Sequence, residues 1–255
     1  MNKKPGYIDA RRLRIGGVPI WSPVPSTLIP GVMEAYGIYE EFIGLETLNL
    51  GGHTKDWEYW MQNAAVLSQG DEAGGAALIT CGGADNDSGQ ITLGGLAGGG
   101  AFFPAANAHL WFEARVFAGC VTAAEFGYYV GLYDPVNAAI LADGFVALPN
   151  QDFLGFVVRD TEVNWSFVGD NATVQDLNPL GAGCVVTAAW HTLGFYVNGV
   201  TDVSVYYDRV LIAAGAVLTA NIPVLGLMPA IAVKAGAAAG LETIAVDYIM
   251  CVQLR

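Results

Sequence analysis

Acidic side chains are the first residues in this sequence that could carry chemistry. Glycoside hydrolysis needs two carboxyl groups that flank one bond, about 5 Å apart in retaining enzymes, and an E-x-D-x-x-E run on one strand supplies them. The sequence has no such run, because Glu40, Glu41 and Glu46 do not share a strand face well. Glu113 is followed two residues later, on the same face, by Arg115. We therefore expect Glu113 to pair with Arg115 or another base rather than to act in catalysis.

Nucleophilic catalysis has no clearer signature. The histidines His53, His109 and His191 have no G-x-S-x-G or Cys/His motif near them. His109 and His191 each begin a strand-like segment, and we expect a backbone partner to satisfy each ring. The glycine-rich run LGGLAGGG lacks the Lys and Ser/Thr of a phosphate-binding loop. The sequence therefore predicts that the chain is not an enzyme.

One loop offers ligands for a metal ion. Asp85, Asn86 and Asp87 provide oxygen atoms of the kind that Ca²⁺ prefers, and Gly89 allows a sharp bend. A complete EF-hand loop would need a glutamate at its twelfth position, where this chain has Leu96. Asx-turn chemistry explains the same residues equally simply. Calcium at Asp85 and Asp87 is therefore the single cofactor that we consider, and we expect it to change thermal stability only modestly.

The cysteines do not form a site in sequence. They stand far apart, without the spacing of a zinc cluster, at Cys81, Cys120, Cys184 and Cys251. We interpret them as small buried hydrophobic residues. The basic N-terminal residues lack the apolar segment of a signal peptide, so we expect synthesis and folding in the cytoplasm.

The charges are divided unevenly along the chain. The net charge of -13, with 11 Lys and Arg, argues against nucleic-acid binding and against an anionic membrane surface. The first 14 residues carry five bases against one acid, a charge of about +4, which leaves about -17 for the rest. These bases are Lys3, Lys4, Arg11, Arg12 and Arg14. They suggest an electrostatic tether to an acidic partner or another copy of the chain, although a solvated basic tail would look the same.

The N-terminal segment also looks like an arm that docks. Four prolines between residues 19 and 30 prevent a regular helix or a central strand. Ile20 and Trp21 would be costly in water, so we expect them to lie against a partner surface. We assign residues 1–36 to an extended, basic, proline-rich arm and residues 37–255 to one folded domain.

The sequence of the domain predicts strands along its whole length. Residues 76–80 and 89–95 resemble a hairpin, and Asn198-Gly199 predicts a type I′ turn. The uncharged stretch 210–233 is long enough to span a membrane, but Pro223 and Pro229 break it into strand-length pieces. Further strand-length segments follow one another between turns: 109–119, 125–134, 143–148, 153–160, 163–170, 191–199, 202–208 and 243–254. This pattern predicts an all-β protein, an antiparallel sandwich of the jelly-roll type.

Several short runs resemble a known group of proteins. They include LWFEARV at residues 110–116, GLYD at 131–134, HTLGFYVNG at 191–199, VYYD at 205–208 and the ending VDYIMCVQLR. In order and spacing these runs are similar to the concanavalin-A-like, laminin-G-like jelly rolls of tailed-bacteriophage virion proteins, and the likeness covers roughly residues 70 to 255. The resemblance implies a capsid decoration or cement protein.

Two hypotheses follow. The first is a non-enzymatic structural subunit on the capsid surface of a virion, assembled in the host cytoplasm, which clamps the major capsid protein or copies of itself as a homo-oligomer. The alternative is a carbohydrate-binding adhesion module, because the sandwich and its 11 Tyr and six Trp suit surface glycans.

Overall fold

The computed structural model describes most of the domain that the sequence predicts. The described residues are 35–40, 42, 53–54, 57–70, 75–93, 100–122, 126–134, 140–141, 151–159, 161–171, 174–213, 221–236 and 240–254. Within them the secondary structure is all β, with sixteen strands and no helix. The arm residues Lys3, Lys4, Arg11, Arg12, Arg14, Ile20 and Trp21 lie outside the described residues, so the division into arm and domain stays a prediction.

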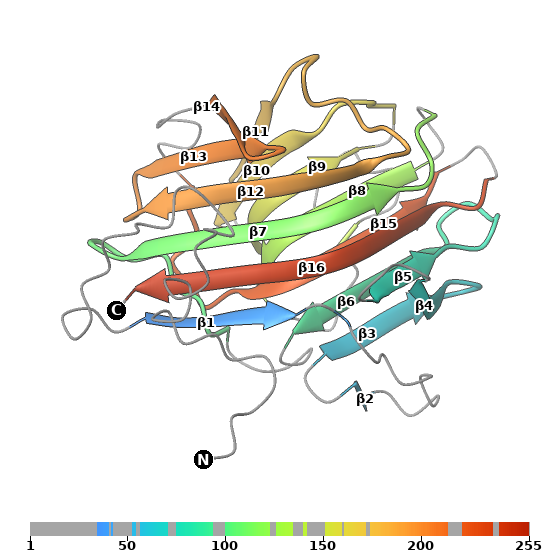
Figure 1. Ribbon diagram of the computed structural model, residues 1–255, viewed down its shortest axis with the longest axis horizontal. Helices are drawn as coiled ribbons and strands as arrows, with labels where there is room; N and C mark the ends of the chain where they lie inside the picture. Colours follow the sequence, from blue (N-terminus) through green and yellow to red (C-terminus); the bar gives the residue numbers. More distant parts are fainter. Residues whose placement is uncertain are drawn as a thin grey trace.

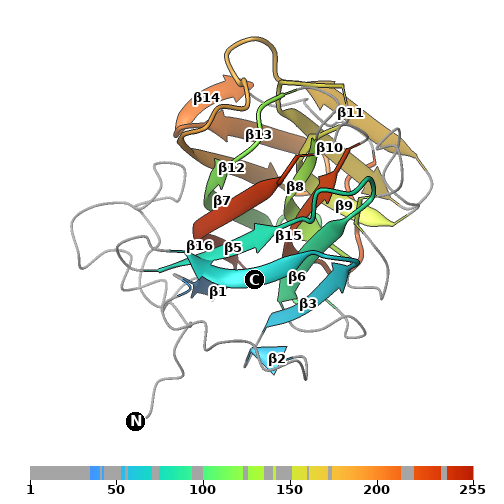
Figure 2. The same cartoon turned by 90° about the vertical axis from the view of Figure 1, so that its right-hand side faces the viewer.

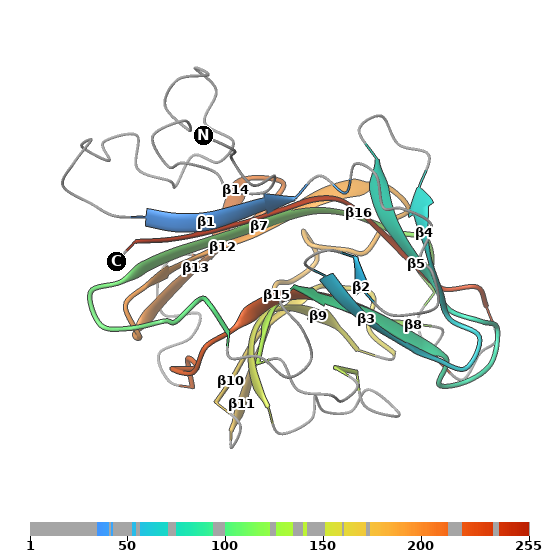
Figure 3. The ribbon, with the colours of Figure 1, turned by 90° about the horizontal axis from the view of Figure 1, so that it is seen from below.

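The described strands form two antiparallel sheets that lie face to face (Figures 2 and 3). Sheet A follows the order β14 (Val210–Ala213), β13 (Asp202–Tyr207), β12 (Trp190–Asn198), β7 (His109–Ala118), β16 (Thr243–Leu254), β5 (Ala76–Thr80) and β4 (Val66–Gly70), and β1 (Ala35–Glu40) also pairs with β16. Sheet B follows the order β11 (Gln175–Pro179), β10 (Ser166–Asn171), β9 (Asp152–Val158), β8 (Phe126–Tyr133), β15 (Met228–Ala235), β6 (Ser88–Leu93), β3 (Trp57–Gln62) and β2 (His53–Thr54). The predicted all-β sandwich is confirmed.

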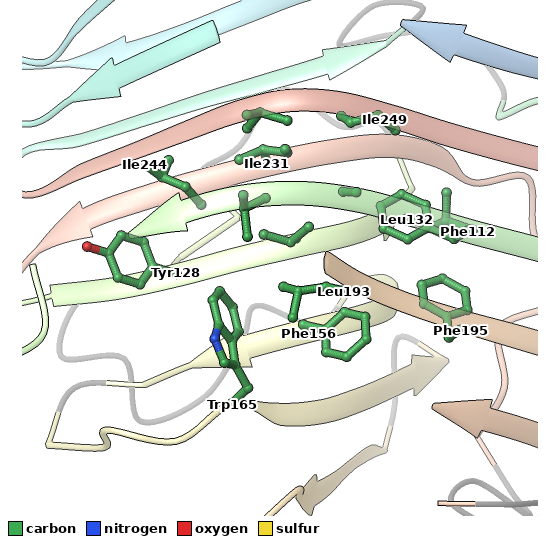
Figure 4. Close-up of a cluster of buried hydrophobic side chains, with 14 of the residues drawn as sticks. Phe112, Tyr128, Leu132, Phe156, Trp165, Leu193, Phe195, Ile231, Ile244 and Ile249 are labelled. Atoms are coloured by element: carbon green, nitrogen blue, oxygen red, sulfur yellow. The ribbon is translucent and has the colours of Figure 1, made fainter. Parts of the chain in front are cut away.

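The main core lies between the sheets because side chains alternate along each strand. On β7 the side chains of Leu110, Phe112, Ala114 and Val116 enter this core, whereas the odd-numbered residues between them face outward. Rings from both sheets meet in it, and the ring centroids of Phe195 of β12 and Phe156 of β9 lie 6.2 Å apart (Figure 4). Removal of such rings from water is the main stabilising contribution to the sandwich.

The outer face of sheet B carries a second apolar cluster. Strands β8, β9 and β15 are buried on both faces, which explains why their sequences are apolar except for Asp152 and Lys234. Ile140 and Leu141 lie over this face and are themselves buried. The Gln90 side chain accepts a hydrogen bond from the Ile140 backbone, and Lys234 donates one to the Leu141 carbonyl. The middle of this face is therefore filled by the chain itself.

Two local predictions were wrong in detail. The segments at 76–80 and 88–93 are strands, but β5 belongs to sheet A and β6 to sheet B, so they are not a hairpin. Residues 81–87 cross between the layers, and such a crossing has the same turn residues as a hairpin loop. Strands β12 and β13 do form a hairpin, yet Asn198 pairs with Asp202. The loop is therefore longer than a two-residue type I′ turn, and of the Asn198-Gly199 pair it is Gly199 that has a positive φ, at 70°.

Other predictions agree with the structure. Within stretch 210–233 the described residues include β14 and the first six residues of β15, and no described helix is long and apolar enough to cross a membrane. All four cysteines are free, and three are buried while Cys120 is half-buried. The predicted strand at 143–148 lies outside the described residues.

Candidate functional site

The outer face of sheet A holds a connected group of charged and aromatic side chains. In Figure 1 the strands that carry it, β12, β7 and β16, lie in front of β8 and β9. The outward residues of β7 stand beside outward residues of both neighbours, because Glu113 pairs with Gly194 on one side and with Met250 on the other. We call the outward side chains of these strands the sheet A face.

Glu113 lies at the centre of this face and is fully buried. Its Oε1 accepts a hydrogen bond of 2.6 Å from the Tyr248 hydroxyl and one of 3.1 Å from the Arg209 guanidinium, whereas its Oε2 is buried without a hydrogen-bond partner. Burial raises the pKa of the Glu113 carboxyl above its usual 4.5, and Tyr248 and Arg209 offset only part of this rise. A buried carboxyl with a perturbed pKa is typical of functional sites, although structural ion pairs produce the same effect.

A strained turn places Arg209 over Glu113. Asp208 and Arg209 connect β13 to β14, and both have positive φ, at 50° and 63°. Non-glycine residues in this conformation cost about 1–3 kcal/mol each, so the surrounding contacts must hold them. Asp208 supplies such contacts, because its carboxylate accepts a 2.8 Å hydrogen bond from the Thr192 backbone and lies 2.8 Å from Nδ1 of His191.

A β-bulge supplies the second charged pair of the face. The register between β16 and β7 shifts between Val246 and Tyr248, so that Asp247 is the extra residue. Asp247 accepts a 2.5 Å hydrogen bond from Arg115. The Arg115 guanidinium also lies 4.7 Å from the ring centroid of Trp190, within the range of a cation–π interaction.

Aromatic rings extend the face along the strands in both directions from Glu113. His109, Trp111 and Tyr196 stack on one another, with centroid distances between 5.2 and 5.9 Å. On the other side of Glu113, Phe117 lies 5.7 Å from Trp190. All of these rings except that of Trp111 are partly exposed.

The structure confirms one expectation about these residues and corrects another. Glu113 does pair with a base, and that base is Arg209, because Arg115 pairs with Asp247. Side chains rather than backbone groups contact the histidines, because Nδ1 of His109 lies 2.6 Å from the Tyr196 hydroxyl and His191 contacts Asp208. In the sequence, only the exposed-face periodicity of β7 could have indicated this face.

The predicted calcium ligands do not share one environment. Asp85 is exposed, whereas Asp87 is buried at 1 % exposure. Among the described residues no group of three or more His, Cys, Asp or Glu could hold a metal ion. A calcium site formed by Asp85 and Asp87 stays a prediction.

Comparisons with known proteins show the fold. No family model matches the chain, and no curated protein matches it. A glycoside hydrolase family protein from Mycobacterium thermorestibile has a TM-score of 0.51 at 12% identity, over 84% of this chain and 98% of that one. The carbohydrate recognition domain of Emp47p has a TM-score of 0.50 at 12% identity, over 83% and 92% of the two chains. Cellulose induced protein Cip1 has a TM-score of 0.50 at 10% identity, over 84% and 96%.

These comparisons confirm the concanavalin-A-like sandwich, which carbohydrate recognition domains and glycoside hydrolase family proteins share. They contradict the prediction that the chain is not an enzyme, because structures of this fold include glycoside hydrolase family proteins. That prediction relied on the missing E-x-D-x-x-E run and on the missing nucleophile motifs. It assigned Glu113 to an ion pair, and it could not show that this side chain is buried beside Tyr248 and Arg209, which come from distant parts of the sequence.

Proposed function

We propose that this chain binds carbohydrate through the sheet A face, with an extended saccharide along β7 and β12. The observation that carries the proposal is the pair of aromatic groups on this face, around Tyr196 and around Trp190, with Arg209 between them. The two groups are six residues apart on β7, from Trp111 to Phe117, which is roughly 20 Å along a strand. A surface of this length favours a chain of sugars over a single ring.

The chemistry of the face suits sugars. The C–H faces of a pyranose ring are apolar and can lie on partly exposed rings such as those of Trp190 and Tyr196. Sugar hydroxyls need polar partners, and the Arg209 side chain is 44% exposed and the Arg115 side chain 38%. Both guanidinium groups are held by carboxylates, so their positions are fixed before a ligand arrives. The fold shared with the Emp47p carbohydrate recognition domain supports the proposal.

A test begins with a glycan array, followed by calorimetry with oligosaccharides of increasing length from the best class. We expect affinity to rise with length until the face is spanned. The variants Trp190→Ala and Tyr196→Ala should each weaken binding at least about fivefold, since one lost aromatic contact costs roughly 1 kcal/mol. Trp60→Ala on β3 of sheet B is the matched control and should bind normally. Absence of binding to any glycan, or equal losses in all three variants, would overturn the proposal.

Cleavage of a bound glycan is the second candidate function. The buried Glu113 carboxyl favours it, because burial raises the pKa of this carboxyl, and burial raises the pKa of the general acid in glycosidases in the same way. Arg209 covers Glu113, so a substrate would have to displace the Arg209 side chain. Release of reducing ends or unsaturated products from a polysaccharide panel, lost in Glu113→Gln, would support cleavage. Unchanged turnover in Glu113→Gln would exclude a role for this residue.

The virion setting is a separate proposal that rests on sequence resemblance. A capsid decoration subunit should occur in hundreds of copies per particle, whether or not it binds sugars. A protein inventory of purified particles tests this prediction. Absence of this protein from the particles would exclude the virion setting. Deletion of residues 1–35 followed by binding to stripped particles tests the proposed contact of the arm with the capsid.

A further inference from the structure

One end of the main core is polar. Cys81 directly follows β5, Glu242 directly precedes β16 and Asp87 directly precedes β6. Each continues the series of side chains that its strand directs into the core. Backbone hydrogen bonds of 2.8 Å hold these segments together, from Cys81 to the Glu242 carbonyl and from Ala235 to the Asp87 carbonyl. Figure 4 shows Tyr128 and Ile244, which follows Glu242 by two residues, at the same end of the drawn cluster.

Asp87 is the unusual residue at this end. It is 1% exposed, and both of its carboxylate oxygens are buried without a hydrogen-bond partner. None of the ion pairs between described residues includes it. A Cβ on Gly82 would lie 2.1 Å from Oδ2 of Asp87, so the carboxylate rests against a bare backbone. The Oδ1 of the adjacent Asn86 is also buried without a hydrogen-bond partner.

A second carboxylate lies nearby. Glu242 is 0% exposed. Burial, together with the charges of Glu242 and Asp87, raises the pKa of the Cys81 thiol to about 12. Cys81 is itself engaged, because its thiol lies 3.6 Å from the Val233 carbonyl as a donor. An ionised carboxylate buried without a partner costs several kcal/mol, and a second negative charge nearby adds to this cost. A bound cation would remove both costs.

The oxygen atoms present select the kind of cation. Carboxylate and amide oxygens are ligands for hard cations, and Ca²⁺ accepts an irregular set of them more readily than Mg²⁺. Zinc and similar metals prefer three or four His, Cys or carboxylate ligands, and the described residues hold no such group. We propose that Asp87 and Glu242 bind a calcium ion at this end of the core, with Oδ1 of Asn86 as a further ligand.

This site differs from the loop site expected from the sequence, because it uses Glu242 and leaves the exposed Asp85 outside. It is also separate from the sheet A face. The ion would link the 81–87 crossing to the start of β16, and hence would tie the two sheets together at this end. Its effect should therefore appear in the stability of the whole sandwich.

The test uses the full chain, freed of metal with a chelator and dialysed. Calorimetry and thermal melting with CaCl₂ should show one ion per chain and a higher Tm with calcium. Asp87→Asn and Glu242→Gln should each weaken calcium binding more than about tenfold, since even residues outside the ligand shell often have that effect. Asp85→Asn, in the same loop, is the matched control and should bind as the wild type does.

Two results would overturn the proposal. The first is a Tm that does not depend on calcium. The second is an equal loss of affinity in Asp85→Asn. If Asp87→Asn does not fold, Glu242→Gln and the wild-type calcium titration still decide the question.

Discussion

Replacement of Glu113 separates the contribution of its charge from that of its shape. In Glu113→Gln the amide oxygen can still accept the hydrogen bonds of Tyr248 and Arg209. The amide nitrogen replaces Oε2, which is buried without a hydrogen-bond partner, and an unsatisfied donor there costs about 1–3 kcal/mol. Removal of the buried charge offsets this cost. We expect the stability of Glu113→Gln at pH 7 to lie within about 1 kcal/mol of the wild type.

Glu113→Ala should be much less stable. It loses the Tyr248 bond, worth about 1.5–3 kcal/mol because its acceptor is charged. The Arg209 bond adds less than about 1 kcal/mol, since that side chain is 44% exposed and solvent screens it. Together the losses are about 2–4 kcal/mol, and in a chain of this size that lowers Tm by roughly 5–15 °C.

The pH dependence gives the sharper test. The folded chain holds the Glu113 proton more tightly than the unfolded chain, because burial raises the pKa above 4.5. Its contribution to stability is therefore complete below pH 4.5 and is lost as pH rises through the raised pKa. Urea unfolding of wild type and Glu113→Gln between about pH 4 and 8 measures this loss as the difference between the two curves. Identical slopes, or a Glu113→Ala variant as stable as the wild type, would refute the reasoning.

Three further predictions concern other parts of the sandwich. Gly131→Ala should lower stability by about 2–4 kcal/mol, since its Cβ would lie 2.6 Å from the Gly155 Cα and the Leu154 carbonyl, whereas Gly183→Ala, with nothing within 4 Å, should melt as the wild type does. A thiol reagent at pH 8 should modify Cys120 first, because burial raises the pKa of Cys81 to about 12 and of Cys184 to about 11; rapid labelling of Cys81 in the folded protein would contradict this. Asp152→Asn should raise the free energy of unfolding at pH 7 and reduce the loss of stability that the wild type shows as pH rises above 4, because burial and then the nearby Asp134 raise the pKa of Asp152. A lower urea midpoint for this variant at pH 7 would contradict the prediction.

Much of the fold was readable from local patterns. The segment 243–254 was predicted with the bounds that β16 has, because its mostly apolar run is long and Gly240 and the polar Glu242 mark its start. The pairing of strands that lie far apart in the sequence could not be predicted from local patterns. The hairpin expected at 76–95 failed because a crossing between sheets and a hairpin loop use the same turn residues.

In the candidate sites, too, local patterns could be predicted from the sequence and long-range partners could not. Period-2 alternation placed Glu113 and Arg115 on one face, but it could not identify Arg209, 96 residues away from Glu113, as the partner. Alternation also suggested that Asp85 and Asp87 act together. That argument holds only within a strand, and Asp85 stands in a turn before β6 begins, so one residue is exposed and the other buried.

The position of β16 has a consequence for biosynthesis. This strand comes last among those described, yet it lies inside sheet A, with β7 along one edge and β5 and β1 sharing the other. Sheet A cannot close before residue 254 is synthesised, and the 136 residues from the end of β7 at Ala118 to the end of β16 at Leu254 take roughly 7–27 seconds at about 5–20 residues per second. During that time the apolar edges of β5 and β7 lack their partner and are open to wrong pairing. The nascent chain should therefore depend on chaperones until its last strand is released, and a premature stop within β16 should yield aggregates rather than a shorter folded protein.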